Sequence, residues 1–170
     1  MRDGIAALVA LALLVVAASL ATTLRAARRR RQRARDAEGA RGRTVLAELP
    51  IGDDLVLVSE DASRLYYGDA PIEKDAIVAV RVLINGSPIA ACVSTRHETN
   101  TPRQATSFED RPEGIARDRW DVAVETAGGT TLIECGAIRE RVSQELARAV
   151  FDAVKRDVER RDADYSGMAR

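Results

Sequence analysis

The sequence has few of the residues from which most catalytic and metal sites are built. Of its 170 residues, one is histidine and two are cysteine. A protein zinc site needs about four Cys or His ligands in closely spaced pairs, so Cys92 and Cys135 match no zinc pattern. We expect both thiols to be free and buried, as is usual for a protein in a reducing cytosol.

The single histidine, His97, begins a polar stretch a few residues after Cys92. A Cys–His pair is the starting point for a thiol enzyme. However, nothing in the sequence indicates an oxyanion hole or a third residue that would orient the histidine. We therefore interpret His97 as a solvated loop residue. Since no catalytic, metal or nucleotide motif is found, we predict that the protein is not an enzyme and binds no cofactor.

Charge is absent from one long stretch near the N-terminus, residues 4–24, which has 21 positions. At about 1.5 Å per residue, a helix of this length spans about 31 Å, close to the hydrocarbon thickness of a bilayer. Only a helix satisfies its own backbone in lipid, so we predict a transmembrane helix. Its polar residues, Ser19, Thr22 and Thr23, are expected to bond back to the preceding turn.

The alternative for this stretch is a cleaved signal peptide, with a small-x-small motif at residues 19–21. Three features favour a retained anchor. The apolar run is long for a signal peptide, residues 1–3 carry almost no net charge, and the positive charges follow the run instead of preceding it.

Arginine dominates the segment that follows. Residues 25–43 contain nine Arg against Asp36 and Glu38, a net charge of +7. The positive-inside rule then places the N-terminus outside the cell membrane and the rest of the chain in the cytoplasm. We predict that this segment binds anionic lipid headgroups, each Arg contributing about 1 kcal/mol. The predicted membrane-surface residues are Arg25, Arg28, Arg29, Arg30, Arg31, Arg33 and Arg35.

Nucleic-acid binding and nuclear import are the other functions of such runs. Beside an apolar span the membrane explains the charges, and we predict no nucleic-acid partner. The lipid bilayer is therefore the first predicted partner. Within the apolar run, the small-residue pairs Ala6/Ala10 and Ala17/Ala21 would support a homodimer through this helix.

The composition divides the chain into four parts. These are a transmembrane helix at 4–24, an Arg-rich juxtamembrane linker at 25–43, a cytosolic α+β domain at 44–162 and a flexible tail at 163–170. Gly39 and Gly42 are expected to end the anchor helix, which frays over 32–43. Residues 44–170 hold 16 basic and 23 acidic residues, a net charge of −7, so this part would repel polyanions.

The first part of the domain consists of short β-like runs. We predict strands at 44–49, ended by Pro50, at 55–59 and at 64–67, with a loop at 68–71.

The clearest hairpin lies in residues 76–95, around Asn85-Gly86, which has the composition of a type I′ turn. The register that such a turn predicts gives one apolar face, formed by Val82 with Ile89, Val80 with Ala91 and Val78 with Val93.

Residues 96–118 form a long polar segment, and loops of such length are often functional or disordered. A second hairpin is predicted to turn at Gly128-Gly129, which pairs Val124 with Ile133 and Val122 with Cys135. The residues predicted to share the core face are Trp120, Val122, Val124, Ile133 and Cys135, with Asp121, Glu125 and Glu134 on the opposite face. Cys135 should therefore be buried and inert.

A helical period begins near Ile138. The apolar stripe is formed by Ile138, Val142, Leu146, Val150, Val154 and Val158, widened by Ala147 and Phe151. The other face carries opposite charges four residues apart, which supports exposure to solvent. We expect the stripe to pack on the sheet.

Together these elements predict an α+β fold: a transmembrane helix, then an antiparallel sheet or half-barrel of about seven short strands closed by a C-terminal amphipathic helix. From Thr44 to about Arg160 this order resembles the pleckstrin-homology-like superfold. Its phosphoinositide-binding members use basic residues at the first hairpin, where this chain has Gly52-Asp53-Asp54. The resemblance therefore implies a scaffold or protein-binding module.

Two functional hypotheses follow. In the first, this is a single-pass membrane protein whose cytosolic domain is an interaction or scaffold module for a protein partner. In the second, it is a small membrane-tethered enzyme or ligand-binding domain that uses the 96–118 loop. The absence of a catalytic constellation favours the first hypothesis.

Overall fold

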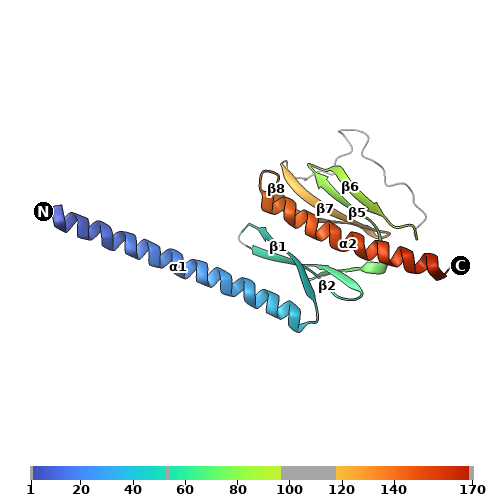
Figure 1. Cartoon of the computed structure of the whole chain (residues 1–170), viewed down its shortest axis with the longest axis horizontal. Coiled ribbons are helices and arrows are strands. Elements are labelled where there is room, and N and C mark those ends of the chain that lie inside the picture. The colour runs from blue at the N-terminus through green and yellow to red at the C-terminus, as the bar shows by residue number, and fades with distance from the viewer. Residues whose placement is uncertain (1, 53, 97–117, 169–170) are drawn as a thin grey trace. The chain divides into compact units, whose positions relative to one another are not determined.

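The computed structural model describes residues 2–52, 54–96 and 118–168 of the chain. The chain divides into two compact units, Met1–Arg41 and Gly42–Arg170. The first unit is a single helix, α1 (Arg2–Ala40), and the second is an α+β domain (Figure 1).

The apolar half of α1 is fully helical and exposed. Its large side chains from Leu11 to Leu24 are 55–67% accessible. As predicted, its hydroxyl groups bond back along the helix: Thr22 Oγ1 donates to the Ser19 carbonyl at 2.7 Å and Thr23 Oγ1 to the Leu20 carbonyl at 2.9 Å. The hydroxyl groups of Thr22 and Thr23 are therefore satisfied within α1.

The Arg-rich half of α1 corrects one expectation. We expected the helix to fray over 32–43, but it continues without a break to Ala40 and includes Gly39. Arg, Ala and Gln are strong helix formers, and one glycine costs only about 1 kcal/mol. Gly42 does lie at the end of α1, with a φ of 75° that glycine adopts freely.

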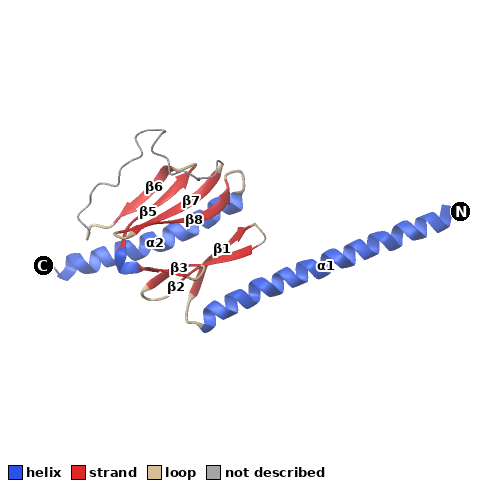
Figure 2. Cartoon of the chain, turned by 180° about the vertical axis from the view of Figure 1, so that it is seen from behind, coloured by secondary structure: helices blue, strands red, loops and turns tan. Residues whose placement is uncertain are grey.

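The second unit contains two four-stranded antiparallel sheets and a long helix (Figure 2). The first sheet has the order β1-β2-β3-β4, from β1 (Thr44–Ile51), β2 (Asp54–Glu60), β3 (Arg64–Tyr67) and β4 (Ala70–Glu73). The second has the order β6-β5-β7-β8, from β5 (Ile77–Ile84), β6 (Ser87–Val93), β7 (Arg119–Thr126) and β8 (Gly129–Ala137). The short 3₁₀ turn η1 (Lys74–Ala76) joins the sheets, and α2 (Arg141–Met168) follows them.

The α+β class is confirmed, and the arrangement is compatible with the pleckstrin-homology-like order of elements. Two details were wrong. The described residues form eight strands instead of about seven, and the sheets do not close into one half-barrel. The eighth strand is β4, which lies where a loop was expected.

Pro50 does not end β1, which runs on to Ile51. Among the described strands β1 pairs only with β2. A proline on such an edge strand removes no hydrogen bond from the ladder when its nitrogen faces away from the neighbour. The predicted end of the strand, at residue 49, was therefore two residues early.

The turn between β5 and β6 is as predicted. Asn85 and Gly86 have φ values of 51° and 78°, the positive pair that a type I′ turn requires. Ile84 pairs with Ser87 across it.

Beyond this turn the predicted register of β6 was wrong. The register shifts after Leu83, which pairs with Pro88, so that Val82 pairs with Ala90 instead of Ile89. This bulge on an edge strand moves the side chains of β6 to the other face. Ile89, expected in the core, is 55% exposed, and Cys92 packs against the core instead.

The hairpin of β7 and β8 also differs in register but not in its faces. Val122 pairs with Ile133 instead of Cys135. A shift of two residues leaves each side chain on the same face. The predicted core residues Trp120, Val122, Val124, Ile133 and Cys135 all lie in the core or pack against it.

One core joins both sheets and α2, which contacts β1, β5, β7 and β8. Val150, Val154 and Val158 of the predicted stripe are buried. Val142 also lies in α2, but its side chain is 61% exposed, because a row with a spacing of four residues drifts by about 40° per step around a helix and leaves the core face. Ile138 precedes the helix.

The predicted flexible tail is helical as far as Met168. A contact with the end of β6 holds this last part of α2. Ser94 Oγ and the Thr95 backbone N–H donate to the two carboxylate oxygens of Asp162, each at 2.7 Å. Nothing in the local sequence pattern predicts this long-range pair.

Candidate functional site

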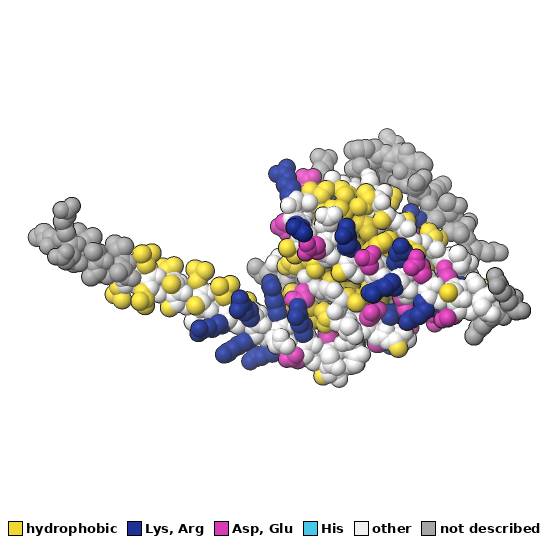
Figure 3. All heavy atoms as spheres, in the orientation of Figure 1, with side chains coloured by type: hydrophobic (Ala, Val, Ile, Leu, Met, Phe, Trp, Pro, Cys, Tyr) yellow, Lys and Arg dark blue, Asp and Glu magenta, His cyan; other side chains and the backbone are white. Residues whose placement is uncertain are grey.

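The predicted membrane-surface residues all lie on α1. Arg25, Arg28, Arg29, Arg30, Arg31, Arg33 and Arg35 are exposed, and they form what we call the arginine stem, residues 25–40 (Figure 3). Successive residues of a helix are turned by about 100°, so these side chains surround α1 instead of forming one stripe. The stem is about 24 Å long. Its guanidinium groups can therefore meet negative charge on every side.

Within the described residues, one helix segment is long and apolar enough to cross a membrane, Leu11–Ala40. It is part of α1 and lies near the N-terminus. A signal sequence near the N-terminus would meet the same criterion of length and hydropathy.

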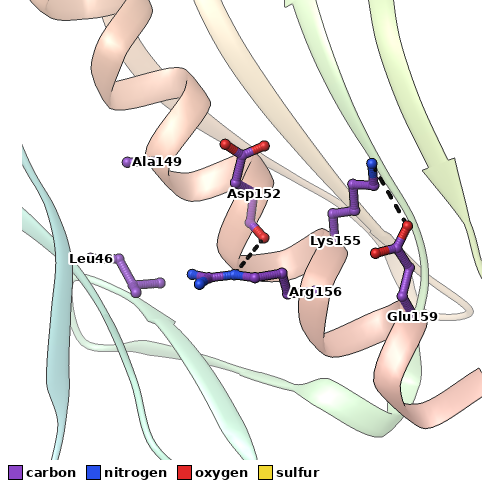
Figure 4. A pocket seen from close by; sticks show the side chains of 6 residues that line it. All are labelled: Leu46, Ala149, Asp152, Lys155, Arg156 and Glu159. Carbon is purple, nitrogen blue, oxygen red and sulfur yellow. Dashed lines mark hydrogen bonds and ion pairs between the residues drawn. The ribbon is translucent and has the colours of Figure 1, made fainter.

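In the domain, a groove of about 500 Å³ lies between β1 and α2 (Figure 4). Its lining consists of Leu46, Ala149, Asp152, Lys155, Arg156 and Glu159. Arg156 extends from α2 toward Leu46, and its Nε donates to the Asp152 carbonyl at 3.2 Å. The Lys155 ammonium lies 3.7 Å from the Glu159 carboxylate. The groove therefore presents side chains of both charge signs beside the apolar side chains of Leu46 and Ala149.

A buried ion cluster connects η1 to α2. The Lys74 ammonium lies 2.8 Å from the Glu60 carboxylate, donates to the Asp61 carbonyl at 2.7 Å and lies 3.9 Å from the Asp157 carboxylate. Lys74 and Asp157 are each only 7% exposed. Asp157 also pairs with Arg160 and Arg161 on α2. Since each buried charge has an opposite partner, the cluster has a structural role.

A second charged cluster surrounds Asp162. Burial alone would raise the pKa of Asp162, but the bonds from Thr95 and Ser94 outweigh it and hold that pKa below its usual value. Arg96 Nε lies 3.4 Å from the same carboxylate. Burial lowers the pKa of Arg161, which pairs with Asp75 at 3.4 Å. These pairs fix α2 to the ends of β6 and η1.

Asp121 is the most deeply buried carboxylate of the domain's described residues, with no exposed surface. It lies on the face of β7 opposite the core, as predicted, and it is buried there as well. Arg119 Nε lies 2.7 Å from Asp121, and Arg119 Nη1 lies 2.7 Å from Glu134. Burial raises the pKa of Asp121. The signal in the sequence was a basic residue two positions before an acidic one on the same strand.

Asp61 organises the turn between β2 and β3. Its carboxylate accepts hydrogen bonds from the Ser63 backbone N–H at 2.8 Å, the Tyr66 hydroxyl at 2.8 Å and the Arg64 backbone N–H at 2.7 Å. These bonds lower the pKa of Asp61 to about 2.

Both cysteines are free. Burial raises the pKa of Cys135 to about 12, so its thiol is inert, as predicted. Cys92 is half-buried, and burial together with the nearby Glu159 carboxylate raises its pKa. His97 and the rest of 97–117 lie outside the described residues, so neither the Cys–His pair nor the predicted loop site can be placed.

No protein-family model matches this chain. No solved structure matches it either. The structure itself shows an α+β domain that follows, in the chain, a helix long and apolar enough to cross a membrane.

Proposed function

We propose that this is a single-pass membrane protein whose N-terminus lies outside and whose α+β domain is a cytoplasmic interaction module. The observation that carries the proposal is α1. Its exposed apolar half continues without a break into the arginine stem, so one helix combines a bilayer-length span with a strong positive-inside signal.

Retention of the helix is supported by the position of the small-x-small motif. Residues 19–21 lie within α1, and the neighbouring Thr22 and Thr23 bond to helix carbonyls. Proteases prefer exposed, extended backbone. A motif held in helical form is a poor cleavage site, and the Arg residues that follow it oppose translocation.

The arginine stem would hold anionic headgroups. Arg25, Arg28 and Arg29 lie within about 8 Å of the end of the apolar run, inside the headgroup layer. A peptide of residues 25–43 should bind vesicles that contain phosphatidylserine and not vesicles of phosphatidylcholine alone. About 1 M salt should release it, because the screening length then falls to about 3 Å. Equal binding to both vesicles would exclude this role.

The domain itself is proposed to bind a protein and not to catalyse a reaction. Its net charge of −7 would keep it away from anionic lipid. In each of the two charged clusters, around Lys74 and around Asp162, the charges are paired within the cluster. Their presence is therefore explained without a substrate. The groove between β1 and α2 leaves charged side chains exposed to a partner.

A topology measurement tests the proposal. The whole chain carries a C-terminal reporter that is active on only one side of the membrane, and membrane and soluble fractions are separated. We expect a cytoplasmic readout from the membrane fraction. A control variant in which the seven predicted membrane-surface Arg residues are Ala should lose this orientation preference. An exported, soluble product would mean that α1 is a signal peptide.

A further inference from the structure

The outer face of α2 carries a regular row of charged side chains. The row, which we call the α2 charge row, consists of Arg141, Glu145, Arg148, Asp152, Lys155 and Glu159. Its spacings alternate between four and three residues, which keeps a row on one side of a helix over several turns. The opposite side of α2 holds the core residues Val150, Val154 and Val158.

The row is symmetric about residue 150. Arg141 and Glu159 lie equally far from this point, as do Glu145 and Lys155, and Arg148 and Asp152 form the third pair. Each of these three pairs joins one basic and one acidic residue. If a second α2 lies antiparallel against this face, all six charges meet opposite charges. In a parallel pair every residue would meet its own copy, and like charges would repel.

We propose that this face of α2 binds a second copy of the chain, with the two α2 helices antiparallel about residue 150. The charge pattern of the row is self-complementary, as a twofold contact requires. Ala149, beside the centre of the row, lines the groove and has a small side chain that permits close approach.

The groove beside the row fits the same arrangement. Its α2 residues, Ala149 to Glu159, then face residues 141–151 of the second copy. That segment carries Val142, which is 61% exposed in the single chain. Leu46 on β1 is the apolar side chain available to receive it.

Exposed ion pairs are individually weak, and some of these charges also pair within the helix, Arg141 with Glu145 at 3.0 Å and Lys155 with Glu159 at 3.7 Å. Pairing between copies therefore depends on a high local concentration. The proposed membrane anchor supplies it by confining the copies to one surface. The inference rests on the proposed function in this respect only.

The test uses the full chain in phosphatidylcholine vesicles, with Ala149→Cys and a short thiol-specific cross-linker. Two copies of residue 149 lie close to the twofold axis, so a covalent dimer is expected. The parent chain gives the background from Cys92 and Cys135. The matched control is Asp69→Cys, an exposed position in the turn between β3 and β4.

Charge exchange decides whether α2 is responsible. In the Ala149→Cys chain, Glu145→Lys or Lys155→Glu alone should lower the covalent dimer about tenfold, because each creates two like-charge contacts. The double variant should restore it. Residues 145 and 155 lie about 15 Å apart along one helix, so this rescue cannot arise within a chain.

Two results would overturn the proposal: cross-linking no stronger than in the Asp69→Cys control, or cross-linking that the single charge variants leave unchanged. The second would mean that the copies meet elsewhere, for example through α1. Flotation of the same vesicles measures the anchor separately. If the chain does not float with the vesicles, the proposed membrane anchor is wrong. The same charge variants at high protein concentration in solution then still test the antiparallel α2 contact.

Discussion

Lys74 and Lys155 are the only lysines of the chain, and they provide a matched pair for testing the buried ion cluster. Lys74→Met removes the charge and keeps most of the side-chain length. It leaves the Asp61 carbonyl without its donor and removes the partner that Glu60 holds at 2.8 Å. An unsatisfied buried polar group costs about 1–3 kcal/mol, and breaking a buried ion pair costs about 3–5 kcal/mol.

Two features reduce the expected loss. Asp157 keeps Arg160 and Arg161, and the methionine side chain packs where the lysine methylenes were. We therefore expect Lys74→Met to lower the free energy of unfolding by about 3 kcal/mol. The Lys155 side chain is 43% exposed, and Glu159 is its one ion-pair partner among the described residues, so Lys155→Met should cost less than about 0.5 kcal/mol.

The assay is urea unfolding of the full chain in excess detergent, with one chain per micelle. Trp120 is the only tryptophan and packs against the core, so its fluorescence reports the domain. The slope with urea should not change, and at a slope of about 2 kcal/mol/M the midpoint of Lys74→Met should fall by about 1.5 M. A loss below about 1 kcal/mol, or equal to that of Lys155→Met, would refute the reasoning.

Three further predictions concern single positions. Gly136 has a φ of 109°, and a Cβ there would lie 2.6 Å from Ser143 Oγ. Gly136→Ala should therefore lower the free energy of unfolding by about 2–4 kcal/mol in the same urea assay. An unchanged urea midpoint would contradict this. The Asp61 carboxyl should titrate near pH 2 by NMR. Since its folded pKa is lowered, its contribution to stability is complete above about pH 4 and is lost as the pH falls toward 2. Asp61→Asn should remove that part of the pH dependence of the free energy of unfolding. At pH 8 a thiol reagent should label Cys92 before Cys135, which should react only as the domain unfolds; equal rates would mean that Cys135 is accessible.

Sequence periodicity predicted the α+β class and most strands because apolar alternation reports burial directly. The two hairpins show its limit. In β7 and β8 the register error was two residues, which preserves the faces, so every predicted core residue there was right. In β6 a bulge between the partners of Leu83 and Val82 shifted the register by one residue. Ile89 therefore lies on the exposed face, and its neighbour Ala90 packs against the core. A bulge depends on the partner strand, so the pattern within β6 could not reveal it.

Buried charges were missed for a related reason. Lys74, Glu60 and Asp157 lie on three different elements, and each alone resembles a surface residue. The burial of Lys74 and Asp157 and the partial burial of Glu60 follow only from the contact of η1, β2 and α2. The arginine stem was found easily because its signal, nine Arg in residues 25–43, is local. Its continuous helical form was not predicted, because Gly39 resembles a helix end in the sequence although the strong helix formers around it offset its cost.

The unbroken α1 has a mechanical consequence. In a flexible tether, one added residue changes only the reach of the chain. In a continuous helix, one residue inserted after the apolar run raises all later guanidinium groups by about 1.5 Å and turns them by about 100°. A change in the length of α1 therefore alters the distance of the guanidinium groups from the apolar run and the direction in which they point at the same time. Insertions of three, four or seven residues nearly restore the direction, whereas those of two or five do not.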